Sequence, residues 1–252
     1  MHENRPTLQE LFDDDVRIEG DPSLRLHGVA EDSRDVVPGG LFVARSGSEC
    51  EGIGFIEDAL AQGAAALLVE SQARLDLPEP SPVVIRADDP RGAGARAAHR
   101  FHGTPCDPLS VVAITGTNGK TTVAWFVRAL LAEVGRRCGL VGTIEIDDGR
   151  EKLVSALTTP SACVLAEALG RMVGHGCDSV VLEASSHALD QGRLAEVAAR
   201  IRKNPEVLVG TPGRLIEHLE ADNLALSELK VLVLDESDRM LDMGFSDDVL
   251  RL

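Results

Sequence analysis

The chain has 252 residues, of which 44% are hydrophobic and 26% are charged, and this is enough apolar material for two ordinary domains. Its formal net charge of −16 argues against a general nucleic-acid-binding surface, because phosphate backbones favour clustered lysine and arginine. No apolar run approaches the roughly 20 residues that span a bilayer, and the first residues do not resemble a signal peptide. We therefore expect a cytoplasmic protein without a membrane span.

The cysteines are scattered along the sequence and include no Cys-x-x-Cys pair. This pattern favours reduced core or surface residues over a disulfide framework or a zinc site. The five positions are Cys50, Cys106, Cys138, Cys163 and Cys177.

The first hundred residues alternate short apolar runs with helical patterns, as strands and helices do. The expected strands are 40–44, 65–69 and 83–85, and the expected helices are 55–62 and 91–101. Three prolines between positions 77 and 82 predict a surface loop. Positions 102–108 are expected to link this part to a second domain.

Residues 115–122 read Thr-Gly-Thr-Asn-Gly-Lys-Thr-Thr and lie between the apolar run 111–114 and a helical pattern at 123–134. A buried strand that ends in a glycine turn and then in a helix N-terminus is typical of a phosphate-binding loop. The sequence therefore predicts a nucleotide site. A glycine turn that holds no phosphate is the alternative.

The residue types of this loop suit phosphate chemistry. Gly116 and Gly119 would let backbone amides converge, Lys120 would supply a point charge, and Thr121 would place a hydroxyl on Mg²⁺. The generic pattern has a further glycine at the position of Ile114, so the first glycine of this loop is displaced.

A second strand and helix follow, with a helix expected at 163–173, closed by Gly174 and Gly176, and a buried strand at 179–182. Strands that alternate with helices predict a parallel sheet, whose ligands bind at the carboxyl ends of the strands. Glu183 occupies such an end, and we interpret it as a metal ligand. A solvated carboxylate is the alternative.

Beyond residue 197 the pattern changes. Buried-strand patterns occur at 207–209 and 231–234, and a helix start is expected at 214–219. The second apolar run ends in Asp235 and Glu236.

Five ordered segments within the first 197 residues resemble the Mur ligase family, most closely its UDP-N-acetylmuramoyl-tripeptide synthetases (MurE). The segments are 32–44, 63–70, 115–122, 157–160 and 183–193. The resemblance implies an α/β fold, with an N-terminal uridine-nucleotide domain at 1–106 and a partial P-loop, parallel-sheet central domain at 107–197.

The resemblance also implies ATP-dependent amide ligation with ATP and Mg²⁺, in which a diamino acid is added to UDP-MurNAc-L-Ala-D-Glu. Lys120 and Glu183 would be catalytic, and Thr121 and Glu183 would hold the metal. The expected ATP-binding residues are Gly116, Thr117, Asn118, Gly119, Lys120, Thr121 and Thr122. The expected UDP-muramoyl-peptide-binding residues are Ser33, Ser48, Thr158, Thr159, Ser185, Gln191 and Arg193. Nothing in the sequence matches the family's diamino-acid-binding domain. Binding of ATP and of the UDP-muramoyl peptide is therefore expected more than the complete ligation reaction.

Residues 198–252 instead resemble part of a DEAD-box RNA helicase core, which implies a RecA-like fragment. In a complete helicase Asp235 would position Mg²⁺ and Glu236 the attacking water. Because this segment has no phosphate loop of its own, the two carboxylates are more simply interpreted as inert. An RNA helicase fragment and a chimeric chain without a function are thus the alternatives to the ligase interpretation.

Overall fold

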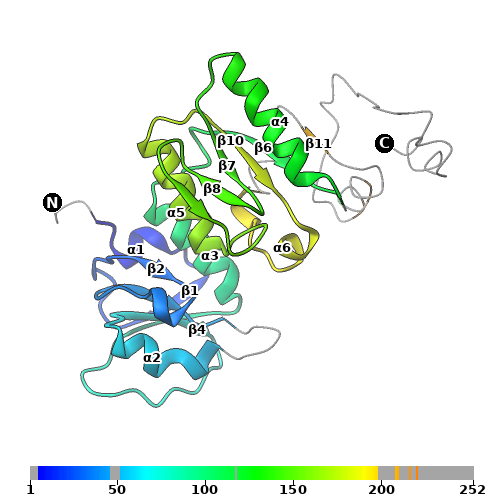
Figure 1. Ribbon diagram of the computed structural model, residues 1–252. Helices are drawn as coiled ribbons and strands as arrows, with labels where there is room; N and C mark the ends of the chain where they lie inside the picture. Colours follow the sequence, from blue (N-terminus) through cyan, green and yellow to red (C-terminus); the bar gives the residue numbers. More distant parts are fainter. Residues whose placement is uncertain are drawn as a thin grey trace. The chain divides into compact units, whose positions relative to one another are not determined.

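The computed structural model of the protein describes residues 5–45, 52–116, 118–197, 208–209, 216 and 220 (Figure 1). The chain divides into two compact units. The first is Met1–Pro105 together with Ser161–Gly170, and the second is Cys106–Pro160 together with Arg171–Leu252. The sequence-based domain limits at 106 and 197 stay predictions.

The first unit is built on a five-stranded sheet in the order β1-β5-β4-β3-β2. The strands are β1 (Val16–Glu19), β2 (Val29–Ala30), β3 (Leu41–Val43), β4 (Ala66–Glu70) and β5 (Val83–Ala87). Strands β2 to β5 are mutually parallel, whereas β1 pairs antiparallel with β5. The helical elements are α1 (Leu8–Leu11), η1 (Ser33–Asp35), η2 (Gly52–Phe55), α2 (Ile56–Ala61) and α3 (Pro90–Phe101).

Both faces of this sheet are buried. Successive side chains of a strand point to opposite sides, so neighbouring residues join different core clusters. Leu41 of β3 and Leu68 of β4 join a cluster that includes residues of α1 and α3. Their neighbours Phe42 and Leu67 join a second cluster with residues of α2. The predicted strands and helices of the first hundred residues thus form, and helices cover the sheet on both sides.

The described residues of the second unit form a six-stranded sheet in the order β11-β6-β10-β7-β8-β9. The strands are β6 (Ser110–Ile114), β7 (Cys138–Val141), β8 (Glu145–Asp147), β9 (Lys152–Val154), β10 (Ser179–Glu183) and β11 (Leu208–Val209). Strand β10 runs parallel to both β6 and β7, with Glu183 opposite Ile114. Strand β11, predicted at 207–209, pairs parallel with β6. Glu183 therefore ends an interior strand.

Both sheets are mixed. The parallel sheet predicted for the central domain forms from β6, β10 and β7 but does not include the strands that follow β7. In the second unit β8 pairs antiparallel with β7 and with β9. Antiparallel strands can be joined by short turns, whereas parallel strands need a long crossover, and only a few residues separate β7, β8 and β9.

Helices α4 (Lys120–Glu133), α5 (Ala162–Gly174) and α6 (Ser186–Asp190) also occur in the described part of the chain. On α4, Val123, Val127 and Leu131 pack against the core formed by β6, β7 and β10. Phe126 and Leu130 belong to the same predicted apolar pattern but are each 67% exposed. Only part of that pattern therefore faces the sheet.

The turn between β8 and β9 is held by Asp148, whose side chain is buried. Its Oδ1 accepts hydrogen bonds from the amides of Arg150 at 3.1 Å and Glu151 at 2.8 Å, and lies 3.0 Å from His175 Nδ1. Its Oδ2 accepts from Arg171 Nε at 3.1 Å. Burial raises the pKa of this carboxyl, but the four donors outweigh burial and hold the pKa at about 2.

We expect Asp148→Asn to cost about 2 kcal/mol of unfolding free energy at pH 7, from the pKa difference between the folded and unfolded chain. A lowered folded-state pKa stabilises the fold above the unfolded-state value near pH 4, and this contribution disappears as pH falls toward 2. Urea unfolding of the native protein and of Asp148→Asn between pH 7 and pH 2.5 measures this contribution. A free-energy difference that stays constant over that range would contradict the assignment.

Candidate functional site

The glycine turn that follows β6 has the backbone geometry that its sequence predicts. Gly116 has φ +143° and Gly119 has φ +77°, and both values lie in the region that favours glycine. Gly119 is the N-cap of α4, so the helix begins directly after the turn. Thr117 lies outside the described residues.

The N-terminus of α4 carries no side-chain cap and no acidic residue in its first turn. The amides of a helix's first turn point out of the helix, and the helix dipole favours negative charge at this end. Lys120 Nζ donates a hydrogen bond to the carbonyl oxygen of Gly116 at 2.7 Å. The ammonium group thus lies across the turn, next to the amides that would bind the phosphates.

Glu183 lies beside this helix end, and its side chain is buried. Its Oε2 accepts a hydrogen bond from Thr121 Oγ1 at 2.9 Å, which joins α4 to the end of β10. Thr143 donates to the same carboxylate through its amide, at 3.0 Å from Oε1, and through its hydroxyl, at 2.9 Å from Oε2. The structure therefore brings the two predicted metal ligands into direct contact.

The oxygens of Thr121 and Glu183 suit Mg²⁺, a hard cation that prefers oxygen ligands and usually completes its shell with water and substrate phosphates. No group of three or more His, Cys, Asp or Glu side chains that could hold a metal occurs in the described part of the chain. Beside a nucleotide, Mg²⁺ takes few ligands from the protein, because phosphates and water supply the others. One hydroxyl and one carboxylate match that small number.

Residues predicted to bind the UDP-muramoyl peptide adjoin Glu183 on its main-chain side. Thr159 Oγ1 donates to the carbonyl oxygen of Glu183 at 2.7 Å and accepts from the amide of Ser185 at 3.1 Å. Arg193 Nη1 donates to the carbonyl oxygen of Thr159 at 2.9 Å, and Arg193 Nη2 donates to Gln191 Oε1. These four residues form one connected network with Glu183.

Thr158 and Ser185 each make one more contact near this network. Thr158 Oγ1 lies 3.1 Å from Thr143 Oγ1, which connects it to the Glu183 carboxylate. Ser185 is also the N-cap of α6 and accepts a hydrogen bond from the amide of Ala188 at 3.2 Å.

Ser33 is buried in η1 of the first unit. Ser48, Asp235 and Glu236 lie outside the described residues, and their assignments stay predictions.

Sequence reasoning missed Gly142 and Thr143. A Cβ on Gly142 would lie 2.4 Å from Glu183 Oε1, so only glycine leaves room for the carboxylate there. Both residues directly follow β7, at the same carboxyl edge of the sheet as Glu183. The rule that located Glu183 would have found them once 138–141 had been recognised as a strand.

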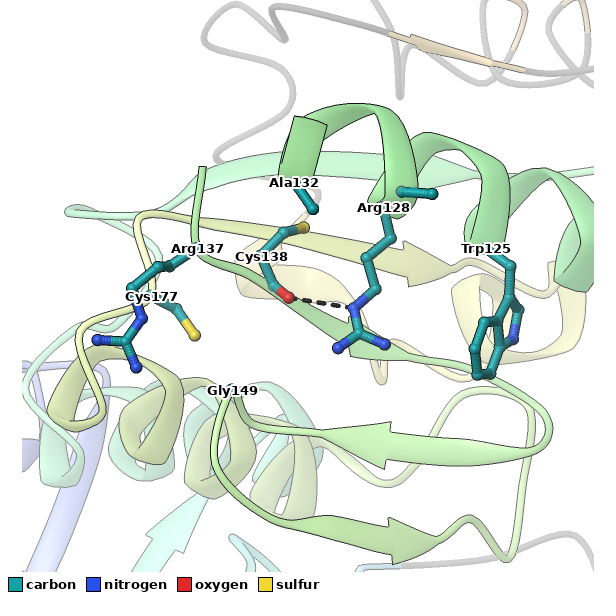
Figure 2. A pocket seen from close by; sticks show the side chains of 8 residues that line it. Trp125, Arg128, Ala132, Arg137, Cys138, Gly149 and Cys177 are labelled. Atoms are coloured by element: carbon teal, nitrogen blue, oxygen red, sulfur yellow. Dashed lines mark hydrogen bonds between the residues drawn. The ribbon is translucent and has the colours of Figure 1, made fainter. Parts of the chain in front are cut away.

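A cavity of about 380 Å³ lies between α4 and the start of β7 (Figure 2). Trp125, Arg128 and Ala132 of α4 line it together with Cys138 and Cys177. Arg128 reaches across and donates from Nε to the carbonyl oxygen of Cys138 at 3.2 Å. Burial raises the pKa of both thiols, and the cavity contains no predicted site residue.

The fold and the site define the class: an α/β protein whose glycine turn, lysine and buried carboxylate have the arrangement of a phosphate-binding loop. Comparison with known families matches residues 25–102 to the Mur ligase family catalytic domain and residues 114–202 to the Mur ligase middle domain. The chain belongs to the Mur ligase family. The resemblance predicted from five sequence segments is confirmed.

Two of the sequence relatives share one enzyme name. The UDP-N-acetylmuramoyl-L-alanyl-D-glutamate–2,6-diaminopimelate ligase of Chlorobium phaeobacteroides is 42% identical over 167 residues, which are 66% of this chain and 32% of that protein. The enzyme of the same name from Geobacillus kaustophilus is 39% identical over 65% of this chain and 32% of its own length. This chain therefore spans about a third of the length of the curated relatives it matches.

Solved structures agree with the sequence relatives. The structure of a UDP-N-acetylmuramoyl-L-alanyl-D-glutamate–2,6-diaminopimelate ligase matches 82% of this chain and 40% of its own, with a TM-score of 0.64 and 30% identity. MurF from Acinetobacter baumannii matches 76% of this chain and 36% of its own, with a TM-score of 0.53 and 18% identity, which shows a common fold.

The helicase-like interpretation of residues 198–252 gains no support from these comparisons. The match to the middle domain ends at residue 202, and most of the segment lies outside the described residues. Within the described part of the chain no helix combines the length and apolar character needed to cross a membrane.

Proposed function

We propose that this chain binds ATP and UDP-MurNAc-L-Ala-D-Glu as part of a cytoplasmic, ATP-dependent ligase of peptidoglycan precursor synthesis, the type that adds 2,6-diaminopimelate. The contact between Thr121 and Glu183, directly beside an uncapped helix N-terminus, is the main support. The names of the similar proteins support the choice of substrate.

In this proposal the first unit contains the uridine-nucleotide domain, with Ser33 and Ser48 at the uracil. The second unit contains the ATP site. No diamino-acid site is assigned to the described residues, and the helicase-like role of Asp235 and Glu236 is not adopted, since the charge of −16 disfavours a nucleic-acid partner.

The reaction of such a ligase transfers the γ-phosphoryl group of ATP to the substrate carboxylate, which gives an acyl phosphate and ADP. The amine of the diamino acid then attacks the acyl carbon, so that an amide forms and phosphate leaves. Such chemistry depends on positioning and charge neutralisation more than on covalent help from the protein. Mg²⁺ would neutralise part of the phosphate charge when it is held by Thr121 and Glu183.

Individual residues of the chain would divide this work. The first-turn amides of α4, with those of Gly116, Thr117, Asn118 and Gly119, would surround the β- and γ-phosphates, and Lys120 would bridge the two groups. Arg193 would face a carboxylate of the muramoyl peptide, because its guanidinium fork can donate two parallel hydrogen bonds. The binding site for the muramoyl peptide would be completed by Thr158, Thr159, Ser185 and Gln191.

Binding of UDP-MurNAc-L-Ala-D-Glu, measured by calorimetry, tests the proposal. We expect saturable binding by the native chain and a loss of about 10- to 100-fold in Arg193→Ala, which is the usual range for a hydrogen bond to a charged group. Arg136→Ala is the matched control, since Arg136 is exposed and pairs with Asp178 at 2.8 Å.

Binding of Mg-ATP without any binding of the UDP-muramoyl dipeptide would leave a nucleotide site and reject the ligase assignment. RNA-stimulated ATP hydrolysis would favour the helicase alternative instead.

A further inference from the structure

Thr143 gives the Glu183 side chain two of the three hydrogen bonds that it receives from described residues. The Thr143 amide reaches Oε1 and the Thr143 hydroxyl reaches Oε2, so both carboxylate oxygens are held by one residue. The third bond comes from Thr121, the other proposed metal ligand. None of the sequence motifs contains Thr143.

The direction of these bonds follows from the groups involved. An ionised carboxylate can only accept, so the single hydroxyl protons of Thr121 and Thr143 both point to Glu183. The oxygen of Thr143 then accepts the hydroxyl of Thr158, which lies at 3.1 Å. A chain of donors therefore runs from Thr158 through Thr143 to the carboxylate, and its polarity is fixed by the charge on Glu183.

The backbone at this point is shaped for the contact. Gly142 brings the main chain so close to Glu183 that a Cβ would lie 2.4 Å from Oε1. The amide of the next residue, Thr143, consequently reaches the same oxygen at 3.0 Å. A side chain at position 142 would push the carboxylate away from this amide.

We propose that Thr143 is a positioning residue, which fixes the Glu183 carboxylate in the orientation that binds Mg²⁺ together with Thr121. This inference rests on the proposed function and adds a residue to it. Glu183 is buried, and within the described part of the chain no lysine or arginine pairs with it, so hydrogen bonds must hold its orientation. Groups that orient a metal ligand typically contribute 10- to 100-fold to metal affinity.

The contribution of Mg²⁺ to ATP affinity separates this role from a structural one. Calorimetry would give the Kd of ATP with Mg²⁺ and with EDTA, for the native chain and for Thr143→Val, which keeps the shape and the amide but removes the hydroxyl. We expect the gain in affinity due to Mg²⁺ to fall about 10-fold in Thr143→Val, at the lower end of the range because the amide remains. The metal-free Kd should stay unchanged.

Two further variants complete the test. Thr143→Ser restores the hydroxyl and should keep the native gain, and Thr143→Ala replaces the valine variant if that variant does not fold. The inference would be overturned if Mg²⁺ raised the ATP affinity of the valine or alanine variant as much as it raises that of the native chain. So would a native chain that binds ATP equally well with and without Mg²⁺, although the phosphate loop would then stand. A native chain that binds no ATP at all would reject the proposed function itself and this inference with it.

Discussion

Replacement of Lys120 by alanine is expected to weaken ATP binding by about 100-fold. Lys120 Nζ lies 2.7 Å from the carbonyl oxygen of Gly116, beside the uncapped start of α4, so the ammonium is already in place before a nucleotide arrives. At an effective dielectric constant near 20 its attraction to a phosphate charge about 4 Å away is roughly 4 kcal/mol. Desolvation offsets part of this, and a remainder of about 3 kcal/mol corresponds to the stated loss.

Lys152→Ala is the appropriate control for this measurement. Lys152 begins β9, is largely exposed, and pairs with Glu145 at 2.8 Å. Both variants change the net charge by the same amount, so a general electrostatic effect would appear in both. Equal ATP affinities in Lys120→Ala and the native chain, measured by calorimetry, would remove the phosphate-loop assignment.

Glu183→Gln is expected to stabilise the metal-free protein and to abolish the effect of Mg²⁺ on ATP binding. The carboxylate is buried and has hydrogen bonds from Thr121 and Thr143 but no cationic partner among the described residues. Burial of a charge without a counterion is costly. A glutamine keeps the shape and removes the charge, so we expect the metal-free protein to become more stable.

Thermal unfolding in EDTA and calorimetric titration with ATP, with and without Mg²⁺, check the two parts of this expectation. Glu145→Gln is a suitable control, because Glu145 is paired with Lys152 and lies on the edge hairpin. A lower melting temperature in Glu183→Gln would mean that the carboxylate stabilises the fold. An unchanged Mg²⁺ effect would mean that the metal binds elsewhere.

The turn and helix start of the proposed phosphate loop could be predicted because the sequence pattern that forms them is local. Gly116, Gly119 and Lys120 lie within five residues, and the strand before and the helix after them have clear apolar patterns. Glu183 needed one further step, the rule that ligands bind where parallel strands end. The structure brings Glu183 to Thr121 across 62 positions of sequence.

Thr143 was missed because β7 has a weak sequence pattern. The run 138–141 contains Gly139, which is unfavourable in a strand by itself. In the fold, a Cβ on Gly139 would lie 2.4 Å from Met172 Sδ, so the glycine allows α5 to pack on the sheet. That reason depends on a distant residue and is absent from the local sequence.

The antiparallel edge was missed for a similar reason. All three residues of β9 are exposed, so its side chains show no alternation between buried and exposed positions. Such a strand forms because β8 offers hydrogen bonds beside it, and sequence periodicity does not report that.

Glu183 belongs to both halves of the site at once. Its carboxylate meets the threonines beside the phosphate loop, while its carbonyl oxygen binds Thr159, whose own carbonyl binds Arg193. In the proposed function, ATP and the UDP-muramoyl dipeptide would bind on opposite sides of this residue. Thermodynamics requires that any change one ligand makes to the affinity of the other is equal in both directions, so titrating each ligand in the presence of the other would measure the same factor.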